Sequence, residues 1–177
     1  MERWLEAALR ENRQILSLRV CLADLRDLEE RYREAEELYR QALAQDNNNH
    51  LALDNLAWLL AHEAGRGAEA LRLINHAIET QGPVPELVDT RAIAYLALGQ
   101  PDLAIAELED LVADPTMSSR LLSSLRFHLA RAYHLAGRSK EAAEQLMKAK
   151  ATGLRSESLH SLERPIYRQL QSELEPQ

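Results

Sequence analysis

Small residues recur along this chain at intervals of 34 to 38 positions. One series is Ala35, Ala70, Ala104 and Ala142, and a second is Ala23, Ala57, Ala92 and Ala130. A third series, Ala8, Ala42, Ala77, Leu111 and Ala149, keeps nearly the same step. Three series that share one period indicate repeated supersecondary units, each of which buries its apolar face only by stacking on its neighbours.

Each repeat is expected to be a pair of helices. Apolar residues recur at helical spacing almost everywhere, and no run alternates as a half-buried strand would. Gly99 and Gly137 suit the position just after a helix, where a left-handed backbone favours glycine. Pro101 suits the first turn of a helix, and Asn49 and Ser139 are candidate N-caps. The sequence predicts helices of about 11 to 18 residues joined by tight turns.

The small residues mark the points where paired helices cross. A larger side chain there would push the helices apart at a cost of about 1–3 kcal/mol. In the stretch DTRAIAYLALGQPDLAIAEL, Ala92 and Tyr95 face the partner helix and Ala104 is the contact on the next one. This stretch therefore represents the repeating unit.

The combined pattern resembles the tetratricopeptide-repeat family. The resemblance rests on LAWLLAHEAGRGAEALRLINHAI, RAIAYLALGQPDLAIAELEDLV and LARAYHLAGRSKEAAEQLMKAK, with a weaker copy in LADLRDLEERYREAEELYRQALAQDNNN. It implies an all-α, right-handed superhelical solenoid of antiparallel helix pairs in a single repeat domain. The expected repeats are 16–49, 50–84, 85–117 and 118–156. The local departures are Glu30, where a glycine is usual, Leu111, where a small residue is usual, and the insertion PTMSSR, which is expected to lengthen the helix that follows it or to make a looser turn.

The two ends extend beyond these four repeats. Ala8 is in phase with Ala42, so residues 1–15 are predicted to be an orphan second helix, which suggests a fragment of a longer bacterial repeat protein. Residues 157–177 break the repeat but keep an apolar face. That face consists of Leu162, Ile166, Leu170 and Leu174. We expect a capping helix there, with Pro165 near its start.

Charge and composition exclude several classes of function. The formal net charge is −7, which gives no general attraction to nucleic acid or to anionic lipid. The longest apolar run, LAWLLA, is too short to cross a bilayer, so no membrane insertion is expected. The lone Cys21 is predicted to be a small buried side chain. The sequence favours a cytoplasmic protein, or a periplasmic one if a signal has been removed.

Signatures of catalysis, cofactors or metals are weak. His62 and Glu63 begin like a zinc-protease motif, but Arg66 stands where the second histidine is required. His128 and His134 are six residues apart and fall on different faces of a helix. We therefore expect no enzyme activity, no catalytic residues, no cofactor and no metal site.

By resemblance, the first helices line a concave groove, and the candidate partner-binding residues lie on them. These residues are Asp24, Leu51, Asp54, Asn55, Trp58, His62, Asp89, Ile93, Phe127, Arg131 and His134. Large aromatics make good interface anchors, but Trp58 and Phe127 also suit inter-helix packing, and the sequence leaves both roles open.

Co-chaperone members of the family hold a C-terminal carboxylate with a clamp of Lys, Asn and Arg. Asn55 matches one position of that clamp, whereas Val20, Asp24, Glu86 and Thr90 occupy the others, so the clamp is absent. The acidic residues beside Trp58 favour an apolar or basic peptide or helix instead.

The expected function is a protein-interaction scaffold that buries a segment of a partner protein in a preformed groove. The alternative is a structural spacer or self-assembly module, in which the exposed N-terminal helix face docks onto another copy to form a homo-oligomer.

Overall fold

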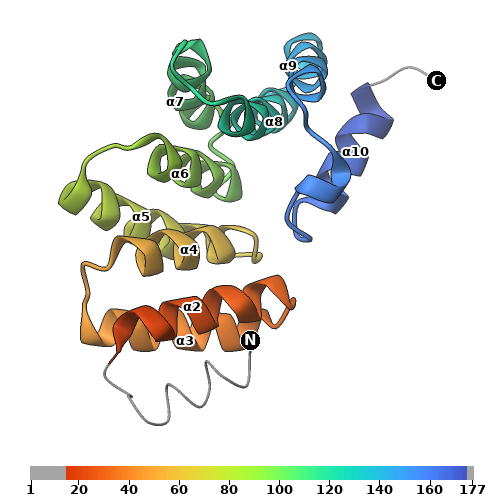
Figure 1. The fold of residues 1–177 in the computed structure, drawn as a ribbon. Coiled ribbons are helices and arrows are strands. Elements are labelled where there is room, and N and C mark those ends of the chain that lie inside the picture. Colours follow the sequence, from red (N-terminus) through yellow and green to blue (C-terminus); the bar gives the residue numbers. More distant parts are fainter. Residues whose placement is uncertain (1–14, 175–177) are drawn as a thin grey trace. The chain divides into compact units, whose positions relative to one another are not determined.

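A computed structural model describes residues 15–174, and within them every regular element is helical (Figure 1). The elements are α2 (Leu16–Leu28), α3 (Tyr32–Gln45), α4 (His50–Ala61), α5 (Gly67–Gln81), α6 (Pro85–Ala97), α7 (Pro101–Ala113), α8 (Ser119–Leu135), α9 (Ser139–Ala151), the 3₁₀ turn η1 (Ser156–Ser158) and α10 (Arg164–Leu174). The predicted all-α architecture of paired helices is confirmed. The predicted orphan helix falls almost entirely on residues outside the described range.

The turns of three helix pairs, α2–α3, α6–α7 and α8–α9, share one hydrogen-bond pattern. After α6, Gly99 has a φ of 69°, its N–H bonds to the carbonyl of Leu96, and the N–H of Gln100 bonds to that of Tyr95. The same pattern follows α8 at Gly137. In the first pair Glu30 occupies the equivalent position with a φ of 61°, so a residue with a Cβ is held in the backbone region that favours glycine.

Other boundary predictions had mixed outcomes. The side chain of Asn49 caps α4 by accepting a bond of 3.0 Å from the N–H of Ala52, and Pro101 begins α7, as predicted. The prediction for Ser139 is wrong, because Ser139 is already the first helical residue of α9. The PTMSSR insertion runs into the start of α8, which has 17 residues from Ser119, and the side chain of Ser118 accepts the capping bond.

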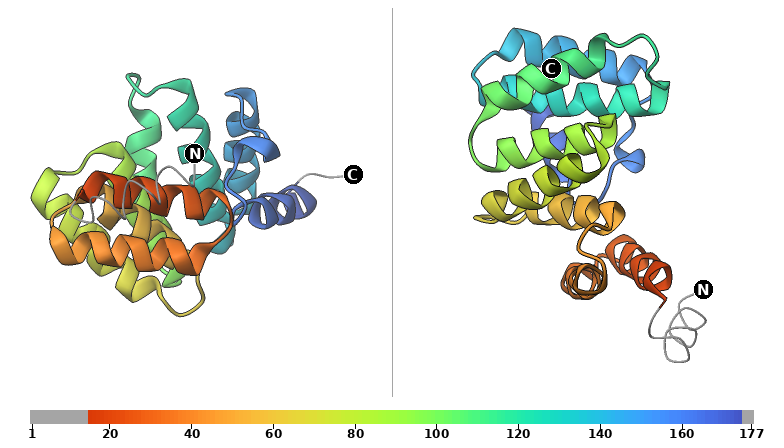
Figure 2. Two further views of the ribbon diagram at one scale, coloured as in Figure 1. Left: turned by 60° about the horizontal axis from the view of Figure 1, so that its bottom comes forward. Right: turned by 90° about the vertical axis from the view of Figure 1, so that its left-hand side faces the viewer.

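The chain forms two compact units, residues 1–87 and 88–177, described here from residue 15 and up to residue 174. In unit 1, α2 packs against α3, α4 packs against α5, and α3 packs against α4 (Figure 2). The alanines of its repeat series are fully buried: Ala23, Ala35, Ala42, Ala57, Ala70 and Ala77 are each 0% exposed. Tyr39, Leu56 and Ile74 fill the space around them. Cys21, which was predicted to be buried, is exposed on α2.

Unit 2 has two apolar clusters. The first joins α6, α7 and α8 through Ala92, Ala104, Leu108, Leu125 and Leu129. The second joins α8, α9 and α10 through Phe127, Ala130, Leu146, Tyr167 and Leu170. Burying side chains of this size contributes about 1.5–3 kcal/mol each, so α10 is an integral part of this unit.

The apolar face of α10 differs from the predicted one. Tyr167 and Leu170 are its buried residues, while Ile166 and Leu174 are only partly buried. The predicted apolar face contained Ile166, whereas the buried side chain is that of the next residue, Tyr167. Tyr167 packs in the cluster formed by α8, α9 and α10.

Candidate binding faces on the first helices

The predicted binding residues fall into two groups, one in each unit. Unit 1 carries Asp24 on α2 and Leu51, Asp54, Asn55, Trp58 and His62 on α4 or at its C-cap. Unit 2 carries Asp89 and Ile93 on α6 and Phe127, Arg131 and His134 on α8. The surroundings of the two groups differ.

In unit 1, the residues 51, 54, 55, 58 and 62 follow one another at helical spacing and form what we call the α4 face. Leu51 is 52% exposed, while Trp58 and His62 are half-buried. The ring centroids of Trp58 and His62 lie 4.1 Å apart, and the Nδ1 atom of His62 lies 2.9 Å from the carbonyl oxygen of Trp58. This contact orients the two rings relative to the helix.

Asp24 is engaged inside unit 1. Its Oδ1 accepts a hydrogen bond of 2.8 Å from the hydroxyl of Tyr39 and one of 2.9 Å from the side-chain amide of Asn55. Burial, together with the charge of Asp24, raises the pKa of Tyr39 well above its ordinary value. Asp24 therefore links α2, α3 and α4, and two of the predicted binding residues, Asp24 and Asn55, bond to each other.

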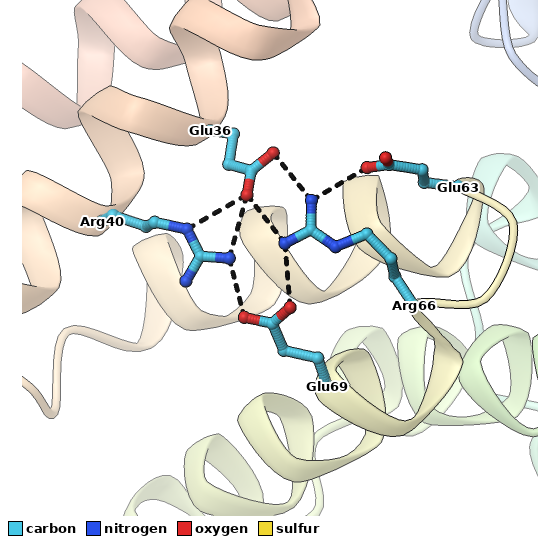
Figure 3. A network of polar contacts seen from close by, with 5 residues as sticks. All are labelled: Glu36, Arg40, Glu63, Arg66 and Glu69. Carbon is cyan, nitrogen blue, oxygen red and sulfur yellow. Dashed lines mark hydrogen bonds and ion pairs between the residues drawn. The ribbon is translucent and has the colours of Figure 1, made fainter.

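An ion-pair network joins the second helices of unit 1 (Figure 3). The guanidinium of Arg66 contacts Glu36 and Glu69 at 2.8 Å and Glu63 at 2.9 Å, and Arg40 contacts Glu36 at 2.9 Å and Glu69 at 2.7 Å. Hydrogen bonding to Arg66 is the main reason that the pKa values of Glu36 and Glu69 are lowered. We did not predict this network, although the contacts across α3 and α5 join residues about one repeat apart.

In unit 2, His128 lies between two carboxylates. Its Nδ1 is 2.6 Å from Oδ1 of Asp89, and its Nε2 is 2.7 Å from Oε1 of Glu163. Its side chain is 3% exposed and that of Glu163 is 8% exposed. Burial by itself lowers the pKa of His128, but the charges and hydrogen bonds of Asp89 and Glu163 outweigh it and raise the pKa to about 10. His128 is therefore a buried imidazolium.

The predicted residues on α8 interact with α10 or with Glu163 just before it. Phe127 is 1% exposed, and its ring meets that of Tyr167 edge to face with a centroid distance of 5.9 Å. His134 lies 2.9 Å from Glu173, and burial lowers the pKa of Arg131 against the opposing charge of Glu163. Thus Phe127 takes the packing role that the sequence left open.

Ile93 is 0% exposed, so it reaches no solvent in this structure. The sequence predicted no binding role for Glu163 or Tyr167. His128 was expected on the inward side of its repeat and not as a metal ligand, whereas Glu163 and Tyr167 lie in the segment assigned to capping alone. Their role is visible only after α10 has been placed.

Two searches of the described part of the chain gave negative findings. Among residues 15–174, no group of three or more His, Cys, Asp or Glu side chains is arranged to hold a metal ion. No helix in that range combines the length and the apolar character needed to cross a membrane.

Comparison with known proteins places the chain in a structural class. The tetratricopeptide-repeat family model matches residues 21–51. No curated protein sequence gave a significant match. The chain therefore contains a tetratricopeptide repeat and has the paired-helix fold of tetratricopeptide-repeat proteins.

Three solved structures illustrate the likeness. TTC0263, a thermophilic TPR protein of Thermus thermophilus, is 24% identical with a TM-score of 0.70, over 94% of this chain and 86% of that one. PilW, described as a widely conserved type IV pilus biogenesis factor, is 23% identical with a TM-score of 0.72, over 95% and 82%. YrrB, described as a TPR protein with an unusual peptide-binding site, is 17% identical with a TM-score of 0.61, over 97% and 87%. At these identities the comparisons establish the fold.

Proposed function

We propose that this chain is a protein-interaction module and that the α4 face of unit 1 binds a peptide or helix of a partner protein. The observation that carries the proposal is the combination, on this one first helix, of a half-exposed leucine and an oriented Trp58–His62 pair. Aromatic and aliphatic anchors of this kind supply much of the binding energy at protein interfaces.

The charge on this face favours an apolar or basic partner segment. Asp54 lies on the same stripe of α4, between Leu51 and Trp58. Carboxylates beside an apolar anchor select partners by charge and speed their encounter more than they add affinity. Asp24 of the neighbouring helix α2 accepts hydrogen bonds from Tyr39 and Asn55.

The comparisons support the class of function without naming a partner. YrrB is described as having an unusual peptide-binding site, and PilW as a type IV pilus biogenesis factor. Because the face is preformed on packed helices, less conformational entropy is lost when a partner binds.

A phage-displayed library of random 16-residue peptides tests the proposal. We expect the full chain to enrich peptides that contain large apolar residues together with Lys or Arg. Leu51→Glu should reduce binding of the enriched peptides at least tenfold. Leu103→Glu is the matched control, because Leu103 on α7 is 48% exposed and lies on a second helix. Equal binding by both variants, or no enrichment at all, would reject the α4 face.

A second candidate function is self-assembly through α2. On this helix Leu28 is 75% exposed and Cys21 is also exposed, so an apolar surface is open near the N-terminal end of unit 1. Light scattering, which measures the molar mass over a range of chain concentrations, tests for self-assembly. A mass that rises with concentration and falls in Leu28→Glu supports assembly, whereas a constant monomer mass excludes it.

A further inference from the structure

The residues predicted to bind a partner in unit 2 already hold a segment of their own chain. Phe127 packs on Tyr167, and His134 pairs with Glu173. Asp89 reaches Glu163 through the shared imidazole of His128. The segment from Glu163 to Leu174 thus occupies the place that the sequence assigned to an external helix.

The contacts hold both ends of α10. Glu163 directly precedes α10 and bonds to His128 near the middle of α8, while Glu173 lies in the last turn of α10 and pairs with His134 near the end of α8. Between these two pairs, Tyr167 and Leu170 are buried against Phe127 and α9. Two polar pairs therefore enclose an apolar contact, which fixes the register of one helix on the other.

The surface that receives α10 has a definite chemistry, and we call it the α8 face: Phe127, His128, Arg131 and His134. It offers an aromatic ring, the guanidinium of Arg131 and the imidazole rings of His128 and His134, and Asp89 of α6 contacts one ring nitrogen of His128 and leaves the other for Glu163. Its occupant supplies matching groups at helical spacing: an acid at 163, an aromatic at 167, a leucine at 170 and an acid at 173. Charge complementarity on this face thus favours an acidic amphipathic helix, the reverse of the preference proposed for the α4 face.

We infer that the α8 face is a second binding site, specific for an acidic amphipathic helix of a partner protein, and that α10 is a built-in competitor that closes it. The inference rests on the proposed function of the chain as an interaction module and adds the class of partner and its regulation. A partner helix that carries acid, aromatic, leucine and acid at the spacing of residues 163, 167, 170 and 173 binds by displacing α10.

The connection between α9 and α10 sets the strength of this competition. Residues 152–163 tether α10 to its site, and a short tether gives an effective concentration on the order of millimolar. A free helix with the same contacts therefore binds the intact chain weakly. It binds tightly once the contacts of the internal α10 are weakened.

The first experiment uses the full chain and a fluorescein-labelled peptide of its own residues 159–174. In the chain, Glu163→Gln and Tyr167→Ala are combined to weaken the internal α10, and the peptide keeps both native residues. We expect fluorescence anisotropy to show at least tenfold tighter binding to this variant than to the unchanged chain. A control peptide with the same two substitutions should bind the variant at least tenfold more weakly than the native peptide. Equal affinity for the variant and the unchanged chain, or for both peptides, overturns the inference.

A second measurement does not depend on the folding of that variant. Millimolar native peptide is added to the unchanged chain, and hydrogen exchange of the α10 amides is followed by mass spectrometry. Displacement predicts faster exchange in residues 164–174 with the native peptide and no change with the control peptide. No acceleration at saturating peptide overturns the inference, whatever the variant does.

These outcomes are separable from those for the α4 face. Leu51→Glu removes library binding in unit 1 but leaves the residues 159–174 peptide unaffected. If the library result fails and the peptide still displaces α10, the α4 face is rejected and the α8 face stands. If displacement fails while Leu51→Glu abolishes library binding, the reverse holds.

Discussion

Units 1 and 2 use the same repeat positions for different purposes. In unit 1, Asp54 lies on a first-helix face that retains a half-exposed leucine, and an ion-pair network joins the second helices. In unit 2, Asp89, one repeat further along, is committed to a buried histidine that holds the C-terminal helix. The repeat thus requires alanine where paired helices cross, but the residues on the face of the first helices can differ in role between the two units.

The two units also depend on different cations. The unit 1 network is built on arginines, which stay charged at any pH a folded protein meets, whereas the unit 2 contact is built on His128, whose charge can be removed. This difference gives each unit its own response to mutation and pH.

Substitution of His128 should have the largest effect. His128→Gln leaves Asp89 and Glu163 buried without their shared cation, and breaking a buried pair costs about 3–5 kcal/mol. We expect faster hydrogen exchange in α8 and α10 and little change in α3 and α5. His76→Gln is the control, because His76 makes its hydrogen bonds at the surface of unit 1. Protection in α10 that stays as in the unchanged chain would contradict this role.

Raising the pH should weaken unit 2 selectively. Because the pKa of His128 is raised from its ordinary 6.5 to about 10, its contribution is fully present below pH 6.5 and is lost as the pH rises through 10. Exchange of the α10 amides, corrected for the intrinsic pH dependence of exchange, should increase between pH 7 and pH 10. Exchange in the α3 and α5 network should change much less. An equal response in both units would show that His128 is not the controlling group.

Lowering the pH tests the unit 1 network. The pKa values of Glu36 and Glu69 are lowered from 4.5, so their contribution is present above about pH 4.5 and is lost as the pH falls below that value. Arg66→Gln should reduce this acid dependence and destabilise unit 1 by about 1 kcal/mol, because the groups are partly exposed. Arg138→Gln is the matched control, since the ion pair of Arg138 with Glu141 is local and lies in unit 2, where its guanidinium also stacks on Tyr133. Added salt should reduce the effect of Arg66→Gln, and a salt-independent loss would point to packing rather than charge.

The smallest expected effect is a gain. Glu30→Gly places glycine where the backbone has a φ of 61° and should stabilise unit 1 by about 0.5–1 kcal/mol. The reciprocal change, Gly99→Glu, should destabilise unit 2 by a similar amount, because no neighbouring atom lies within 4 Å of an added Cβ and only the backbone is strained. Urea unfolding of both variants measures the two changes in the free energy of unfolding. Destabilisation by Glu30→Gly would show that the Glu30 side chain outweighs the strain.

Local signals in the sequence were sufficient for most of the fold. The positions of Ala35, Ala70 and Ala104 required small residues at close helix contacts, and the structure buries all three completely. Asn49 and Pro101 were correctly placed because capping and proline geometry depend on adjacent residues. The prediction for Ser139 was wrong by one residue, because the N-cap position belongs to Arg138. The prediction for Cys21 was wrong because the residue lies on the exposed face of its helix and not on the buried one.

The sequence by itself determined the repeat, the helix pairs and the positions of the first-helix residues, because these depend on spacing within about 38 residues. Only the tertiary structure decided what those residues do. Asp89, His128 and Glu163 are separated by 39 and 35 residues along the chain, yet they share one buried contact. No periodicity within a repeat encodes it, because it forms only when α10 leaves the repeat register and folds back onto α8.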